Sequence, residues 1–286
     1  MNRFTFYMTC FVCCFWGTCA NVLATEDTNC KQFFDEGRFV AEAIQPCQIA
    51  CEQHDEAMCT FLGFLYIEGQ GVKKDYNKAI AYWEKACGLK EFFGCASLGR
   101  MYEQGHGVIQ DYSKAKNYYE KACDLDARLG CTDLGRLYDI GRGVKQDYTQ
   151  AKKKKKKACD GEDGAGCRNL GYLYELGQGV RQDYSKAKDY HEKSCNRNHG
   201  EGCFSLGRLY AEGQGVRQDY SKAKIYYEKS CNLNSYGGCF ALAVLYTEGS
   251  GVRQSPTTAK EYFGKACDMG YQPGCDAYRE LNEKGF

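Results

Sequence analysis

Residues 203–231 read Cys203-Phe-Ser-Leu-Gly-Arg-Leu-Tyr-Ala-Glu-Gly-Gln-Gly-Val-Arg-Gln-Asp-Tyr-Ser-Lys-Ala-Lys-Ile-Tyr-Tyr-Glu-Lys-Ser-Cys231, and this stretch decides the fold. Its first half has one apolar stripe with the i, i+3, i+4, i+7 spacing of a helix, formed by Leu206, Leu209, Tyr210 and Gly213. Gly213 and Gly215 provide a left-handed helix end. The first half therefore predicts a short helix that stops at a glycine turn.

The second half predicts another helix. Asp219 occupies an N-cap position, and a second stripe runs through Ala223, Tyr226 and Tyr227. In a later copy of this stretch the N-cap is Ser255. Pro256 follows at the first helical position, where proline is favoured. No segment alternates with period two. The stretch is therefore a helix hairpin, with a helix A followed by a helix B.

The hairpin repeats every 36 residues, and cysteines mark the period. One cysteine column consists of Cys51, Cys87, Cys123, Cys159, Cys195, Cys231 and Cys267. A second column, eight residues later, consists of Cys59, Cys95, Cys131, Cys167, Cys203, Cys239 and Cys275. The sequence thus predicts one repeat array rather than two globular domains.

A glycine recurs inside helix A, at Gly63, Gly99, Gly135, Gly171 and Gly207, with Ala243 in the last copy. Glycine costs about 1 kcal/mol relative to alanine within a helix. A packing reason is therefore expected, and we predict a close approach to the small residue of helix B, such as Ala223.

Composition indicates an oxidising compartment. The chain has 286 residues with 20 Cys and a net charge of +1, which argues against nucleic-acid binding. Residues 1–24 contain an apolar run at 4–16 and a small-residue cleavage setting at Val22-Leu23-Ala24, which predict a cleaved signal peptide. We expect a secreted or periplasmic bacterial protein with no stable membrane span after cleavage.

The motifs Leu-Gly-x-Leu-Tyr, Gly-x-Gly-Val, Asp-Tyr-x-Lys-Ala and Tyr-Tyr-x-Lys-Ala-Cys resemble the Sel1-like repeat, a relative of the tetratricopeptide repeat. The Cys-x7-Cys pair at each junction resembles the Helicobacter cysteine-rich protein family. This resemblance implies an all-α fold, a right-handed α/α superhelix of 36-residue hairpins with a concave face built from the A helices.

The predicted organisation has four parts. A signal peptide (1–24) precedes an N-terminal capping half-unit (25–53). Six repeats follow over 54–269, namely 54–89, 90–125, 126–161, 162–197, 198–233 and 234–269. A C-terminal capping helix completes the chain at 270–286.

The cysteine spacing alone permits two pairings, Cys59–Cys87 within a hairpin or Cys87–Cys95 across a junction. The resemblance implies the second, with each bridge closing a loop of about nine residues and contributing about 2.6 kcal/mol in the chain-entropy model. The implied disulfides are Cys51–Cys59, Cys87–Cys95, Cys123–Cys131, Cys159–Cys167, Cys195–Cys203, Cys231–Cys239 and Cys267–Cys275. Cys30 and Cys47 lie off these two columns, and we expect them to pair with each other, the alternative being that one remains a reactive thiol. Zinc sites favour shorter spacings, so we expect no metal and no cofactor.

The residue between Gly and Leu on helix A faces away from the predicted core, because each residue advances about 100°. This column and its flanks vary between copies, and they suit peptide backbone, carboxylates and aromatic rings. The candidate groove residues are Arg100, Glu103, Arg136, Asp139, Asn169, Tyr172, Glu175 and Arg208. An ordinary solvated face is the alternative.

A Ser-x-x-Lys motif begins at Ser113, Ser185 and Ser221. In penicillin-recognising enzymes such a serine is the nucleophile. The Helicobacter cysteine-rich family is associated with penicillin binding and slow β-lactam hydrolysis, so the resemblance implies a weak β-lactamase as an alternative function. These serines also fit the first turn of helix B, and no Lys-Thr-Gly accompanies them.

The run Lys152–Lys157 departs most from the repeat, because Lys154 and Lys155 replace the paired aromatics of other copies. We interpret it as a weakened unit with a solvated basic ridge, the alternative being a docking patch for an acidic partner or a membrane.

The predicted function is an exported, disulfide-rich scaffold that binds peptides or proteins in its concave groove. The alternatives are the weak penicillin-binding protein or β-lactamase, acting on β-lactams or peptidoglycan-like fragments, and a purely structural spacer.

Overall fold

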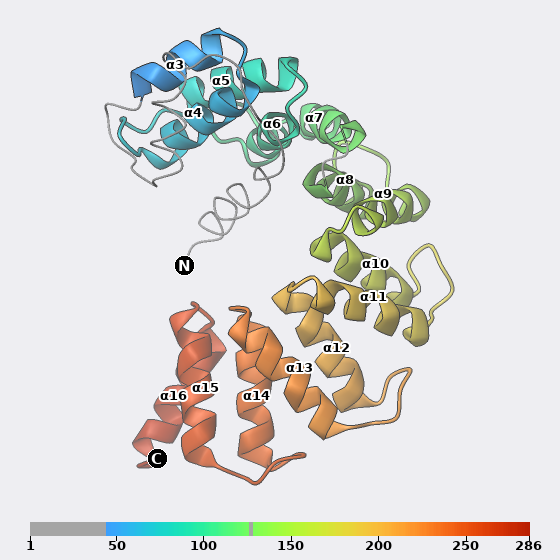
Figure 1. The fold of residues 1–286 in the computed structure, drawn as a ribbon. Helices are drawn as coiled ribbons and strands as arrows, with labels where there is room; N and C mark the ends of the chain where they lie inside the picture. Colours follow the sequence, from blue (N-terminus) through green and yellow to red (C-terminus); the bar gives the residue numbers. More distant parts are fainter. Residues whose placement is uncertain (1–43, 126–127) are drawn as a thin grey trace, which may run out of the picture. The chain divides into compact units, whose positions relative to one another are not determined.

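The computed structural model describes residues 44–125 and 128–286. All regular structure within these residues is helical, in helices α3 to α16 (Figure 1). The described residues form two compact units, which divide between residues 118 and 119. The predicted signal peptide and Cys30 lie outside the described residues, so the cleavage site and the Cys30–Cys47 pair stay predictions.

The helices form consecutive hairpins, each with a helix A and a helix B. In chain order the pairs are α4 (Glu56–Glu68) with α5 (Tyr76–Gly88), α6 (Phe92–Gln104) with α7 (Tyr112–Asp124), α8 (Arg128–Ile140) with α9 (Tyr148–Asp160), α10 (Gly164–Leu176) with α11 (Tyr184–Asn196), α12 (Gly200–Glu212) with α13 (Tyr220–Asn232), and α14 (Tyr236–Glu248) with α15 (Pro256–Asp268). Helix α3 (Ile44–Glu52) precedes them and α16 (Gln272–Glu283) follows. The predicted all-α hairpin repeat is confirmed.

The turn between helix A and helix B follows the predicted chemistry. Gly213 ends α12 in the left-handed region (φ 70°), and its N–H donates to the carbonyl of Leu209. Asp219 caps α13 by accepting from the Lys222 N–H, and Ser255 caps α15 ahead of Pro256. Glycine is needed at the helix end because other residues pay a steric cost at positive φ.

A glutamine stabilises the same turn. The Gln218 Nε2 donates to the carbonyl of Ala211 at 2.8 Å and to the hydroxyl of Tyr220 at 3.0 Å. Gln110, Gln146 and Gln182 make the equivalent pair of bonds. The side chain therefore satisfies a free carbonyl at the end of helix A and fixes the start of helix B.

Helix A and helix B approach closely where the recurring glycine lies. A Cβ at Gly207 would be 2.7 Å from the Tyr227 ring and 3.3 Å from the carbonyl oxygen of Ala223. The predicted close approach is present, but the nearest atoms belong to Tyr227 rather than to the Ala223 methyl group. We name this site on helix B the inner helix-B position. Its occupants are Trp83, Tyr119, Lys155, His191, Tyr227 and Phe263, each at most 6% exposed.

Disulfides join helix B of one hairpin to helix A of the next. All seven pairs implied by the family resemblance are present, with Cα atoms 4.4–4.8 Å apart. Small residues bring the two helices together there, as where a Cβ at Gly202 would be 2.5 Å from the Ser194 Cβ. The Ser194 hydroxyl also donates to the Gly164 carbonyl at 2.7 Å.

Helix A of one hairpin also contacts helix A of the next, because α8 meets α10, α10 meets α12, and α12 meets α14. Side chains from successive A helices can therefore meet on one face of the second unit.

Removing one junction disulfide should destabilise the array. Replacing both Cys195 and Cys203 by Ala should lower the free energy of unfolding by about 2.6 kcal/mol, the loop-closure contribution of a nine-residue loop. Denaturant titration followed by circular dichroism measures this. The same comparison under reducing conditions is the control, because the covalent contribution then vanishes from both proteins. A deficit of equal size after reduction would assign the effect to side-chain packing instead.

Candidate functional site

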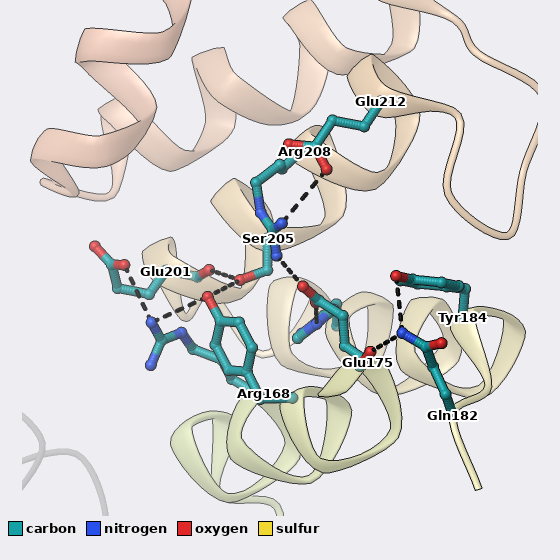
Figure 2. Close-up of polar contacts among 10 residues, drawn as sticks. Arg168, Glu175, Gln182, Tyr184, Glu201, Ser205, Arg208 and Glu212 are labelled. Atoms are coloured by element: carbon teal, nitrogen blue, oxygen red, sulfur yellow. Dashed lines mark hydrogen bonds and ion pairs between the residues drawn. The ribbon is translucent and has the colours of Figure 1, made fainter. Parts of the chain in front are cut away.

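The candidate site is a polar face formed by α10 and α12, which we call the α10–α12 face (Figure 2). It consists of Arg168, Tyr172, Glu175, Glu201, Ser205, Arg208 and Glu212, with His191 of α11 beneath it. Three of its members, Tyr172, Glu175 and Arg208, are predicted groove residues that the fold brings together.

Glu175 is the centre of the face. Its carboxylate is only 5% exposed and accepts from the Arg208 guanidinium on one oxygen. The other oxygen lies 3.2 Å from His191 Nε2. Arg208 also reaches Glu212, at 3.5 Å, one turn further along α12. A buried carboxylate thus holds a half-exposed guanidinium in one place.

The pKa values of this group follow from burial and hydrogen bonding. Burial, with the nearby charges of Arg168 and Arg208, holds the pKa of His191 below its usual value although the Glu175 carboxylate raises it. Burial raises the pKa of Glu175, but the hydrogen bonds from His191 and Arg208 together hold that pKa below its usual value. A neutral His191 therefore donates from Nε2 to an ionised Glu175, while its buried Nδ1 has no hydrogen-bond partner.

Tyr172 connects the two helices at the outer side of the face. The Ser205 hydroxyl is 3.1 Å from the Tyr172 hydroxyl, and the Arg168 guanidinium lies over the tyrosine ring, 4.7 Å from its centroid. Arg168 Nη2 is also 3.6 Å from Glu201 on α12. The ring meets His191 edge-on, with centroids 5.2 Å apart. Each side chain is held from at least two directions, so the face is preorganised.

The face exists because the repeat pattern changes at the inner helix-B position. His191 stands where other hairpins place Trp83, Tyr227 or Phe263, and burial requires a partner for its polar ring. Glu175, 16 residues earlier on helix A, provides it.

The preceding hairpin shows the same exchange with a different pair of residues. Lys155 occupies the inner helix-B position at 4% exposure and forms an ion pair with Asp139, also 16 residues earlier. Burial lowers the pKa of Lys155 and raises that of Asp139. The interpretation of Lys152–Lys157 as a solvated ridge is therefore wrong for Lys155.

The other lysines of this run are more accessible. Lys153, Lys156 and Lys157 are exposed and line a shallow depression of 440 Å³ together with Asp160 and Gly161. Lys156 pairs with Asp160, and Lys157 donates to the carbonyl of Cys123.

The remaining predicted groove residues are distributed over both units. Arg100 and Glu103 lie on α6, in the first unit. Arg136 lies on α8 and is 3.5 Å from Asp133, while Asn169 is half-buried on α10. Of the predicted groove residues, Tyr172, Glu175 and Arg208 are those that contacts join in the α10–α12 face.

Sequence reasoning did not single out Arg168 or His191. The sequence does contain a signal for this pair. His191 interrupts a helix-B column that is otherwise mainly aromatic, and Glu175 lies 16 residues before it. Glu175 was predicted as a groove residue, whereas the structure buries it and uses it to position Arg208.

The candidate serines lie in the first turns of helices B, and Ser113, Ser185 and Ser221 are all exposed. Hydrogen bonding to Asp189 raises the pKa of Lys188, and hydrogen bonding to Glu228 raises that of Lys224. A catalytic lysine base must be neutral, so these contacts work against proton abstraction from Ser185 or Ser221. No arrangement among the described residues favours a serine hydrolase.

No group of three His, Cys, Asp or Glu side chains in residues 44–125 and 128–286 is arranged to hold a metal ion. Within the same residues, no helix has the length and apolar character needed to span a bilayer.

Comparison with known proteins agrees with this architecture. The family described as Sel1 repeat matches six segments, 57–90, 93–126, 128–153, 164–199, 200–235 and 238–271. The chain belongs to the Sel1 repeat family. No curated protein sequence matches it significantly.

Three solved structures illustrate the likeness. A Sel1 repeat protein from Oxalobacter formigenes is 27% identical with a TM-score of 0.78, covering 85% of this chain and 99% of that one. The protective antigen c5321 of uropathogenic Escherichia coli is 27% identical with a TM-score of 0.68, and it covers 86% of this chain. This Sel1 repeat chain spans 53% of that antigen.

Helicobacter pylori cysteine rich protein B is 36% identical over 47% of this chain and 97% of its own, with a TM-score of 0.39. The predicted relation to Sel1-like repeat proteins is confirmed. Repeat scaffolds of this kind act mainly by presenting extended surfaces to other proteins.

Replacing His191 by Phe should change how stability depends on pH. Because the folded pKa is lowered, the stability that depends on a neutral His191 is present above the unfolded value of about 6.5 and is lost as pH falls through the folded pKa. At pH 8 the variant should be less stable by about 1–3 kcal/mol, since it lacks a hydrogen bond to a charged group.

The deficit should shrink steadily from pH 7 to pH 5. Protonation of His191 in the unfolded chain lowers the stability of the wild type over this range, whereas the variant has no histidine at this position. Urea titrations at each pH measure the difference between the two proteins. His106→Phe, at an exposed position, is the control. A deficit that stays constant with pH would show that His191 does not titrate in this range.

Proposed function

We propose that this chain is an exported interaction scaffold that binds an extended peptide segment of a partner protein, with the α10–α12 face as the centre of the binding surface. The partner's carboxylates and backbone carbonyls would accept from Arg168 and Arg208, and an apolar or aromatic side chain would contact Tyr172.

The observation that carries this proposal is the fixed geometry of Arg168, Tyr172 and Arg208. Arg168 and Arg208 have side chains 26% and 27% exposed, so both are partly accessible to a ligand. Their positions are set by buried or half-buried partners, which reduces the conformational entropy lost on binding. Arg and Tyr are also the residues that most often dominate binding energy at interfaces.

Export is inferred from the disulfides. Seven bridges are typical of secreted or periplasmic proteins, because the cytosol keeps thiols reduced. The proposed signal peptide, residues 1–24, is consistent with such a route. The β-lactamase alternative receives no support from the placement of Ser113, Ser185 and Ser221 and is not proposed.

Peptides selected from a display library on the oxidised protein provide the test. Binding of the selected peptides should weaken by about tenfold or more when Arg168→Gln and Tyr172→Ala are combined, because both would contact the peptide. Isothermal titration calorimetry measures the affinity. The same two types of change on α16, Arg279→Gln with Tyr278→Ala, form the matched control, since both side chains are exposed.

Both double variants should retain the wild-type melting temperature within a few degrees, so that lost binding is not lost folding. Peptides that bind the α10–α12 variant as well as they bind the wild type would refute this face as the binding surface.

A further inference from the structure

A row of cations follows the loops between helix A and helix B in the second unit. Each loop has a cation two residues before the helix-B N-cap, namely Lys145, Arg181, Arg217 and Arg253, and the loop after α8 also contains Arg142. All four side chains are exposed. None of the four forms an ion pair with a carboxylate of the described residues.

The loops that carry these cations are rigid. The Gly-x-Gly of each loop is left-handed at both glycines, with φ of 68° and 64° at Gly177 and Gly179. The adjacent Gln182 ties the loop to the Glu175 carbonyl at 2.8 Å and to the Tyr184 hydroxyl at 2.9 Å. Gln146 and Gln218 make the same two bonds, and Gln254 donates to the Thr247 carbonyl, so a glutamine ties each loop to the end of helix A.

Neighbouring loops also fix one another's spacing. A Cβ at Gly179 would be 2.4 Å from the Tyr148 Cβ, and the same contact recurs between Gly215 and Tyr184 at 2.6 Å. Gly251 rests on the next such tyrosine, Tyr220, at 2.5 Å. The loops after α10, α12 and α14 thus each lie directly on the first helix-B residue of the hairpin before them.

This contact places the loops in single file. The loops after α10, α12 and α14 lie along one edge of the second unit (Figure 1). Helix A of one hairpin also contacts helix A of the next, as α10 does α12 and α12 does α14, which brings the ends of these helices side by side.

Nearby acidic residues do not neutralise the row. Asp147, Asp183 and Asp219 follow the cations in sequence, but each caps helix B and accepts from its backbone N–H groups. Their negative charges lie at helix N-termini, where the positive end of the helix dipole offsets them. The four cations are exposed and have no carboxylate partner among the described residues.

The shape of the row indicates its ligand. A single file of cations, one in each 36-residue repeat, fits a linear polymer of anions, whereas a flat membrane surface would favour a broad basic patch. Arginine binds carboxylate and sulfate oxygens in pairs. The disulfides place the protein where extracellular polysaccharides, rather than nucleic acids, are the available linear polyanions.

We propose that this loop edge binds a linear acidic polysaccharide, with one cation per repeat contacting its carboxylate or sulfate groups. This surface is separate from the α10–α12 face, so the proposal extends beyond peptide binding and does not depend on it.

A charge-matched pair of quadruple variants tests the proposal. The loop variant replaces Lys145, Arg181, Arg217 and Arg253 by Gln. The control variant replaces another one-per-repeat column of cations by Gln, at the far end of helix B: Lys157, Lys193, Lys229 and Lys265. Both variants lose the same charge from the same four hairpins.

The probes are a size-defined heparin oligosaccharide and an oligogalacturonate, titrated at several salt concentrations into the full, oxidised protein. The loop variant should bind both about tenfold or more weakly than wild type, since four exposed ion pairs each contribute modestly. Its salt dependence should also be shallower, because fewer counterions are released. The control variant should bind within about threefold of wild type.

Equal losses in the two variants would overturn the proposal, because they would show attraction by total charge alone. Unchanged binding by the loop variant would overturn it as well. Vesicles containing phosphatidylserine and a single-stranded oligonucleotide are parallel probes, and tighter loop-dependent binding to either would refute the polysaccharide assignment. Peptide binding at the α10–α12 face should be the same in both variants, which separates this test from that of the proposed function.

Discussion

The close contact between a helix-A glycine and the inner helix-B position constrains the hairpins that contain Gly63, Gly135, Gly171 and Gly207. At Gly171 an added Cβ would lie 2.6 Å from the His191 ring, and at Gly207 it would lie 2.7 Å from the Tyr227 ring. The glycine accepts a helix-propensity cost so that a large side chain can fill the space between the helices. Because this position is nearly inaccessible to water, its occupant must be apolar or must bring a hydrogen-bonding partner.

In two hairpins the occupant of this position is polar and has a hydrogen-bonding partner. The polar surface of the protein follows from these two pairs. Buried Lys155 is paired with Asp139, and buried His191 is paired with Glu175. Both carboxylates come from helix A of the same hairpin. Once Glu175 is buried, its second oxygen is available to hold Arg208 from the next hairpin. A change within the core of one repeat thus organises the exposed face shared by two.

Periodic features of this fold could be predicted from the sequence, because each occurs in many copies. The glycine turn at Gly213, the N-caps at Asp219 and Ser255 and the 36-residue spacing follow from local rules that need no knowledge of distant contacts. The disulfide pairing could not be derived this way, since Cys87 had a plausible partner both in Cys59 of its own hairpin and in Cys95 of the next one. The burial of Lys155 and Glu175 depends on which helix-B residue meets the glycine, and helical periodicity alone does not give that register.

The junction disulfides explain how the array tolerates polar residues in its core. A buried ion pair or hydrogen-bonded histidine is often no more stabilising than well-packed apolar residues, and its partners are costly if separated. In a repeat array the stability of a weak unit is supported by its interfaces with its neighbours. The hairpins of Lys155 and His191 each have a disulfide at both junctions, including Cys159–Cys167 between them. Covalent interfaces therefore leave the inner helix-B position free to vary, and that variation gives one part of a regular scaffold a face of its own.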